Sequence, residues 1–170
     1  SGLKLNKARL SFLILFSGGL IGSRSVQLQE IAHHMDGCAK AQSNVRRIQR
    51  FLSSYSLSFE WIAWFILLLL PKKTFKLSMD RTNWDFGQVS FNLLVITLYW
   101  DGVGFPLYFE SLDHKGNSNT QMRQKVLQQC LDRLGTPRVA AFHADREFIG
   151  EDWVKWLLLQ RIPFFLRVRN

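Results

Sequence analysis

Two aspartates, Asp80 and Asp145, are the residues of this sequence best placed to do chemistry. Asp80 follows the alternating stretch 75–79, and Asp145 comes shortly after the apolar stretch 138–142. If these stretches are neighbouring parallel strands, both carboxylates lie at corresponding carboxyl ends, where ligand sites in such sheets collect. Adjacent carboxylates repel each other unless a cation neutralises them, and oxygen ligands select a hard ion such as Mg²⁺ or Mn²⁺. The spacing therefore predicts metal-dependent phosphodiester chemistry, in which ions about 4 Å apart activate a water or a 3′ hydroxyl.

The alternative for each aspartate taken alone is a turn or helix cap, which is the commoner role of an Asp at a strand end. Two features favour the chemical interpretation. Both aspartates fall at matching ends of the predicted elements, and a basic helical segment precedes them.

The elements that would position the aspartates follow the order β-β-β-α-β-α-β, which suits a mixed sheet flanked by helices and hence an α/β fold. The turn dipeptide Asp101-Gly102 predicts a primed hairpin turn, and Pro106 indicates an edge strand or a bulge. Ser118 and Gln121 resemble a capping box, and Gly135 ends that helix. The predicted strands cover 75–79, 92–100, 103–109, 138–142 and 163–168, and the helices 118–134 and 151–160.

The front of the chain, residues 1–73, reads as a separate helical domain ahead of a sheet domain over 74–170. Apolar periodicity predicts helices near 10–20, before the glycines at 18, 19 and 22, and over 26–35 and 39–52. Residues 1–73 hold ten Lys and Arg against three Asp and Glu, a net charge of +7, whereas the remainder carries +2. Such an asymmetry points to a polyanionic partner.

A tight Asp-Gly turn joins the second and third of these helices, which makes a helix-turn-helix candidate. The third helix is rich in side chains that pair with base edges or neutralise phosphates. The alternative is a solvated basic face on an ordinary helix. The candidate DNA contacts are Gln42, Asn44, Arg46, Arg47 and Arg50.

Other classes fit less well. Cys38 and Cys130 are too few for a disulfide framework and lack zinc-ligand spacing, so we expect two ordinary thiols. The apolar runs 10–21 and 61–70 fall short of the roughly 20 residues that span a bilayer. A signal peptide over the first run and a membrane-associated protein are therefore the disfavoured alternatives.

Longer motifs then resemble a known family. The stretch 77–84 resembles the first-aspartate motif of insertion-sequence transposases of the Asp/Asp/Glu class. The stretch 143–150, with the tryptophans and the segment 163–169 that follow, resembles the second-aspartate block of the insertion-sequence-four family. The basic stretch 46–52 is similar to that family's amino-terminal DNA-binding region.

The resemblance implies a ribonuclease H-like core in which Asp80 and Asp145 are catalytic metal ligands for Mg²⁺ or Mn²⁺. It implies double-stranded DNA partners (transposon ends and target), a homodimer on DNA, and a bacterial cytoplasmic location at the nucleoid. Arg146 would contact phosphate, or else pair with Glu147 or Asp152. Lys115, near the helix start, would meet the DNA backbone, or else belong to a plain cap. Arg81, Thr82 and Trp84 would support the first aspartate.

The third acid of this family lies further on, inside a Tyr/Arg/Glu/Lys signature that this sequence lacks. Glu147 and Glu151 are too close to Asp145 to replace it, and Glu110 is on the wrong strand. We therefore expect an incomplete fragment of a transposase, inactive in strand transfer, that begins and ends inside a longer protein. The alternative function is a non-catalytic DNA-binding remnant or repressor derived from a transposase.

Overall fold

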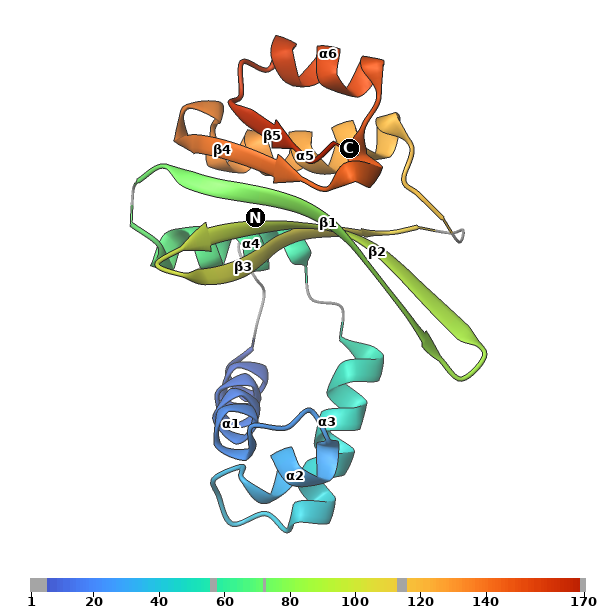
Figure 1. The fold of residues 1–170 in the computed structure, drawn as a ribbon. Helices are drawn as coiled ribbons and strands as arrows, with labels where there is room; N and C mark the ends of the chain where they lie inside the picture. Colours follow the sequence, from blue (N-terminus) through green and yellow to red (C-terminus); the bar gives the residue numbers. More distant parts are fainter. Residues whose placement is uncertain (1–5, 56–57, 72, 113–115, 169–170) are drawn as a thin grey trace. The chain divides into compact units, whose positions relative to one another are not determined.

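The computed structural model describes residues 6–55, 58–71, 73–112 and 116–168 and divides the chain into two compact units between Ser58 and Phe59. The first unit is helical and the second contains a sheet (Figure 1). This boundary lies earlier in the chain than the one that the change of periodicity predicts, which is after residue 73. Helix α4 (Phe59–Leu69) belongs with the sheet because it packs against strand β3 (Val103–Ser111) and buries Ala63 in the same core.

Three helices make up the first unit: α1 (Lys7–Ser23), α2 (Leu28–His33) and α3 (Ala41–Ser54). Asn6 caps α1 by accepting a hydrogen bond from the Arg9 amide at 2.9 Å. The expected interruption at the glycines of α1 is wrong, because the helix runs through them to Ser23. The buried core combines one residue of α1 with residues of α2, α3 and the turn between them, namely Phe12, Ile31, Ala32, Met35, Val45, Ile48 and Phe51.

A five-stranded mixed sheet organises the second unit, with strand order β3-β2-β1-β4-β5. The first three strands form an antiparallel meander, and β4 and β5 continue the sheet in parallel with β1. The expected α/β class and element order are thus confirmed. The remaining elements are β1 (Phe75–Phe86), β2 (Val89–Trp100), α5 (Thr120–Leu134), η1 (Thr136–Arg138), β4 (Val139–Ala144), η2 (Arg146–Phe148), α6 (Glu151–Leu159) and β5 (Phe164–Leu166).

One face of this sheet carries the core. Alternate residues of the central strands are buried with residues of α4, α5 and α6 in one cluster, among them Leu77, Met79, Ile96, Phe142 and Trp153. Because successive strand residues point to opposite faces, their neighbours along each strand point to the other face. Among the described residues, Ser78, Asp80 and His143 on that other face are half-buried or exposed, whereas Ala141 is buried.

Two turn predictions are confirmed. Asp101 and Gly102 both have positive φ, at 50° and 77°, as the primed hairpin turn requires. Pro106 lies in the edge strand β3, at a shift in the β2–β3 register, so the missing amide hydrogen removes no regular ladder bond.

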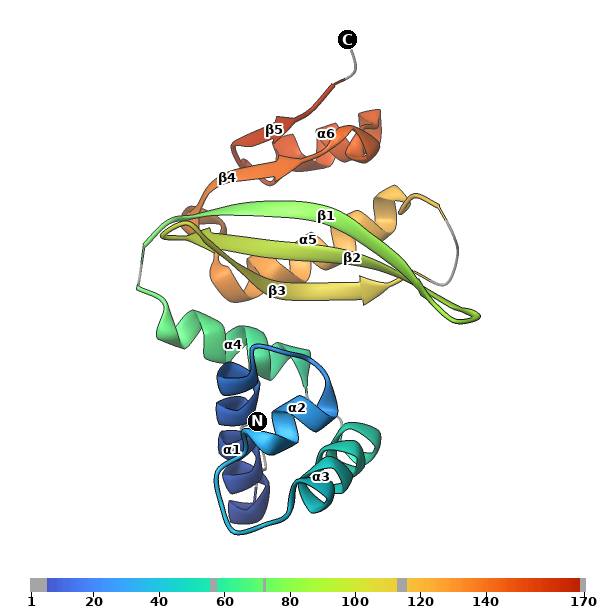
Figure 2. The ribbon, with the colours of Figure 1, turned by 60° about the horizontal axis from the view of Figure 1, so that its bottom comes forward.

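Two details differ from expectation. Strand β1 does not end at Asp80 but continues to Phe86, because it pairs with β2 as far as Val89 in a long hairpin that projects past β3 (Figures 1 and 2). Helix α5 is capped by Asn119, whose Oδ1 accepts from the Met122 amide at 2.8 Å. Ser118 is instead buried and accepts a hydrogen bond from Arg123 at 3.0 Å.

Both cysteines are free thiols, with Cys38 exposed and Cys130 buried. Among the described residues, no helix combines the length and the apolar character needed to cross a membrane.

Candidate functional site

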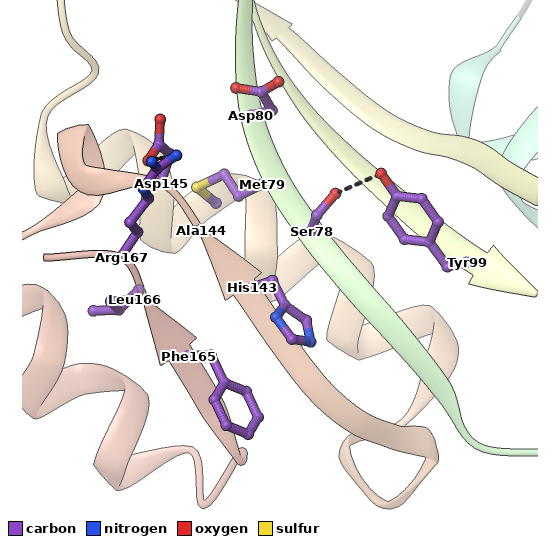
Figure 3. Close-up of a pocket in the computed structure, with 10 residues that line it drawn as sticks. All are labelled: Ser78, Met79, Asp80, Tyr99, His143, Ala144, Asp145, Phe165, Leu166 and Arg167. Carbon is purple, nitrogen blue, oxygen red and sulfur yellow. Dashed lines mark hydrogen bonds and ion pairs between the residues drawn. The ribbon is translucent and has the colours of Figure 1, made fainter. Parts of the chain in front are cut away.

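The two predicted aspartates lie side by side on adjacent strands. The parallel β1–β4 ladder ends with Met79 opposite Ala144, so Asp80 and Asp145 occupy the next position on each strand. Met79 and Ala144 point into the core at 2% and 8% exposure. Alternation along the strands therefore turns both aspartates toward the opposite face. Both residues line one cavity (Figure 3).

Each carboxylate has a neighbour that lowers the cost of its negative charge. Asp80 Oδ1 accepts a hydrogen bond from the backbone amide of Arg81 at 2.8 Å. Asp145 Oδ1 lies 4.0 Å from Nη1 of Arg167, whose side chain is 80% exposed. The contact is long and solvent-screened, so it contributes little stability. Both aspartates remain exposed, and their oxygens are accessible to a ligand.

A cavity of about 530 Å³ adjoins the two carboxylates (Figure 3). Its aromatic wall includes His143, which stacks on Phe165 with ring centroids 5.1 Å apart. Across from them the Ser78 hydroxyl donates to the Tyr99 hydroxyl at 3.5 Å. The cavity therefore combines two acids, hydroxyl groups, flat rings and the cation of Arg167 on one open surface.

The two carboxylates have the chemistry of a divalent-cation site. Mg²⁺ commonly binds through one or two carboxylates and completes its octahedron with waters and substrate phosphates. Asp80 and Asp145 supply two hard oxygen donors on one face and so fit such a cation. Among the described residues, however, no group of three or more His, Cys, Asp or Glu side chains gathers to hold a metal.

The residues that follow the two aspartates lie in different surroundings. Arg81 points to the core side of the sheet and pairs with Glu147 at 3.0 Å. Trp84 stacks on Phe91 on the projecting part of the hairpin, with centroids 5.5 Å apart. Arg146 is exposed, and its suggested partner Glu147 is engaged by Arg81.

The basic helix α3 presents only part of its predicted set to solvent. Gln42, Arg46 and Arg50 are exposed. Asn44 is 2% exposed, and it donates to the carbonyl of Ala32 at 3.4 Å. Its role is therefore to tie α3 to α2, and we do not retain it as a DNA contact.

Arg47 and Lys115 complete the predicted set. Arg47 is half-buried, donates to Asn44 Oδ1 at 3.1 Å and covers the ring of Phe12 at 5.5 Å. It therefore supports the packing of the helical unit whether or not it also reaches DNA. Lys115 lies outside the described residues.

Sequence reasoning missed the buried cation Arg123, which is 6% exposed. Burial lowers the pKa of its guanidinium, and the nearby charge of Glu147 opposes that shift. A signal was present in the sequence, because Arg123 occupies the apolar stripe of α5 one turn before Leu127 and two before Cys130. A charged residue on such a stripe indicates a specific polar partner.

Comparisons with known proteins give partial likenesses only. The chain is similar to the catalytic core domain of HTLV-2 integrase in complex with magnesium (dimeric form), at 12% identity and a TM-score of 0.42 over 58% of this chain and 62% of that chain. It is also similar to a chain of the simian T-cell lymphotropic virus intasome in complex with PP2A regulatory subunit B56 gamma. There the identity is 15% and the TM-score 0.39, over 58% of this chain and 33% of that one.

The chain thus aligns with less than two thirds of either chain. No protein-family model matches the sequence, and no curated protein does. The insertion-sequence-four resemblance therefore stays a prediction, and a function has to be argued from the site itself.

Proposed function

We propose that this protein is part of a DNA transposase of the Asp/Asp/Glu class, with a ribonuclease H-like core of the insertion-sequence-four type. The observation that carries the proposal is the pair Asp80 and Asp145, one position beyond the last residues of the β1–β4 ladder and on the face away from the core. The reaction is metal-dependent transfer of DNA phosphodiester bonds.

Asp80 and Asp145 would hold Mg²⁺ or Mn²⁺ through their carboxylate oxygens. When bound, such an ion activates the attacking oxygen and stabilises the leaving one. Asp80 and Asp145 would hold the ion on the open face, and a DNA strand would reach it through the cavity lined by Tyr99 and Phe165. Arg146, exposed directly after Asp145, would contact a DNA phosphate.

The helical unit would bind double-stranded DNA, both transposon ends and target, through Gln42, Arg46 and Arg50 of α3, with Arg47 contributing from its half-buried position. Two DNA ends held together need two copies, so a homodimer on DNA forms part of the proposal, as does action at the bacterial nucleoid.

Manganese binding tests the proposal directly. Titration of the 170-residue chain with Mn²⁺, followed by electron paramagnetic resonance, should reveal one site whose affinity falls at least tenfold in Asp80→Asn and in Asp145→Asn, since each change removes one of two charged ligands. The matched control is Asp101→Asn, because this exposed turn residue has a positive φ that Asn also adopts. Binding unaffected by both site variants would reject the metal-site assignment.

A second candidate function is a non-catalytic DNA-binding remnant or repressor. It is favoured by the lack of any three-ligand metal group among the described residues. This alternative predicts DNA binding without Mn²⁺ binding.

For either candidate we expect this polypeptide alone to leave a terminal-repeat duplex uncut. Metal-dependent cleavage of that duplex by this polypeptide would contradict the expectation.

A further inference from the structure

The strand pair that carries the aspartates separates immediately after them. The β1–β4 ladder ends at Met79 and Ala144. Strand β1 then continues alongside β2, whereas the chain after Asp145 turns into the short helix η2. The β1–β4 ladder therefore fixes the approach to the two carboxylates, but it does not join the two chain segments that follow them.

A side-chain link spans this gap. Arg81, the residue after Asp80, donates from Nε to both carboxylate oxygens of Glu147, at 3.2 Å and 3.1 Å, and from Nη2 at 3.0 Å. Glu147 is the second residue after Asp145. Paired guanidinium and carboxylate groups of this kind fix relative orientation as well as distance.

Glu147 is held at its backbone as well. The guanidinium of Arg123, on α5, donates from Nη2 to the carbonyl of Glu147 at 3.1 Å and lies over the ring of Phe148 at 5.3 Å. Phe148 is fully buried in the core. Three elements, β1, α5 and the core beneath η2, therefore converge on one residue beside the proposed metal ligand.

Burial gives this arrangement its stiffness. The Arg81 and Glu147 side chains are only 19% and 21% exposed, whereas those of the exposed pair Lys125–Glu110 are 53% and 30% exposed. Removing one partner of a largely buried pair leaves an uncompensated charge, so the pair resists separation even where it adds little net stability.

We propose that the Arg81–Glu147 pair is a positioning clamp that holds the backbone of Asp145 beside Asp80, so that both carboxylates meet one cation. Arg81 and Glu147 point to the core side, so neither touches the cation or the DNA. The inference rests on the proposed function for its consequence, but the clamp itself is a property of the fold. Groups behind metal ligands commonly alter affinity by tenfold or more.

The test is a double-variant cycle on the 170-residue chain with Mn²⁺ as the probe. Arg81→Lys keeps the charge but loses the planar fork, and Glu147→Gln keeps the shape but loses the charge. Each should weaken Mn²⁺ binding about tenfold, and the double variant should be no weaker than either single one, because both break the same link. Lys125→Gln, which breaks the exposed pair, should leave the affinity unchanged.

A second measurement needs no metal. The Phe148 amide donates to the Asp145 carbonyl at 3.0 Å, so its hydrogen exchange reports the backbone between the ligand and the clamp. Arg81→Lys should accelerate exchange at Phe148 while amides in the middle of β2 stay protected.

The outcomes separate the two proposals. Mn²⁺ binding that needs both aspartates but ignores Arg81→Lys and Glu147→Gln overturns the clamp and leaves the proposed function standing. A wild-type chain without a Mn²⁺ site at the aspartates overturns the proposed function. In that case the Phe148 exchange rate decides the clamp alone, and an unchanged rate in Arg81→Lys overturns it.

Discussion

Gly19 of α1 passes so close to Ile31 that a Cβ at this position would lie 2.7 Å from the Ile31 carbonyl oxygen and 2.8 Å from Cγ of Met35. Helix α1 therefore packs so closely against α2 that the space at Gly19 is too small for a methyl group. This contact positions α2, and through Asn44 it also positions the basic helix α3.

Gly19→Ala should destabilise the helical unit by about 1–3 kcal/mol, the usual cost of overpacking a core. Gly18 is the matched control, since a Cβ there meets no atom within 4 Å. Gly18→Ala should stabilise the helix by roughly 0.5–1 kcal/mol, because Ala loses less backbone entropy. Urea unfolding followed by circular dichroism measures both changes, and equal effects of the two variants would contradict the close contact.

The exposed arginines of α3 should determine how DNA affinity depends on salt. Loss of each phosphate contact lowers the slope of log K against log salt by about 0.9. Arg46→Ala and Arg50→Ala should each flatten the slope by roughly that amount, with little loss of folding stability because both side chains are exposed. Fluorescence anisotropy on duplex DNA between 50 and about 200 mM salt measures the slope, and unchanged slopes would remove α3 as the DNA-binding helix.

Arg47→Ala should behave differently from its neighbours. The side chain packs on Phe12 and bonds Asn44. Its removal should therefore lower the unfolding free energy of the helical unit by about 1 kcal/mol, a typical value for one lost hydrogen bond. A thermal melt alongside the anisotropy measurement checks this, and a variant as stable as Arg46→Ala would refute the packing role.

The buried thiol of Cys130 should make stability fall at alkaline pH. Burial raises its pKa from 9.0 to about 12. Between these values an unfolded chain loses the proton while the folded chain keeps it, so the folded state binds more protons and loses stability as pH rises. Burial also raises the pKa of Tyr108, which adds to the loss in the same direction.

Cys130→Ala should therefore unfold with a flatter dependence on pH above about pH 9, although it begins from a lower stability because it leaves a cavity. Cys38→Ala, at an exposed thiol, is the control and should keep the wild-type slope. Melting temperatures across the alkaline range measure this. A Cys130→Ala slope equal to that of wild type would show that the thiol does not contribute.

Local signals predicted the elements that depend on local chemistry. Asp101-Gly102 specified its own turn, and Gly135 ends α5 with φ at 83°. Alternation predicts β1 only as far as Asp80, because residues 82–85 of the hairpin beyond it are all exposed and show no alternation of buried and exposed side chains. The adjacency of Asp80 and Asp145 was predictable since parallel neighbours bring their carboxyl ends to one edge.

Features that depend on tertiary contacts were not predictable. Arg81 and Glu147 are 66 positions apart, and nothing in either local sequence identifies the other. Asn44 looked like a base-reading side chain because a buried amide and an exposed one have the same sequence context on a polar helix face. Only the packing of α2 against α3 shows that its partner is the Ala32 carbonyl.

Iron-directed cleavage shows whether Asp80 and Asp145 share one divalent cation. Fe²⁺ placed in an Mg²⁺ site and treated with ascorbate and peroxide generates hydroxyl radicals that cut the nearby backbone. We expect cuts in both β1 near Asp80 and the β4–η2 segment near Asp145, suppressed together by excess Mg²⁺ and absent in either Asp→Asn variant. Cuts confined to one of these segments, or cuts that persist in both variants, would contradict a shared cation.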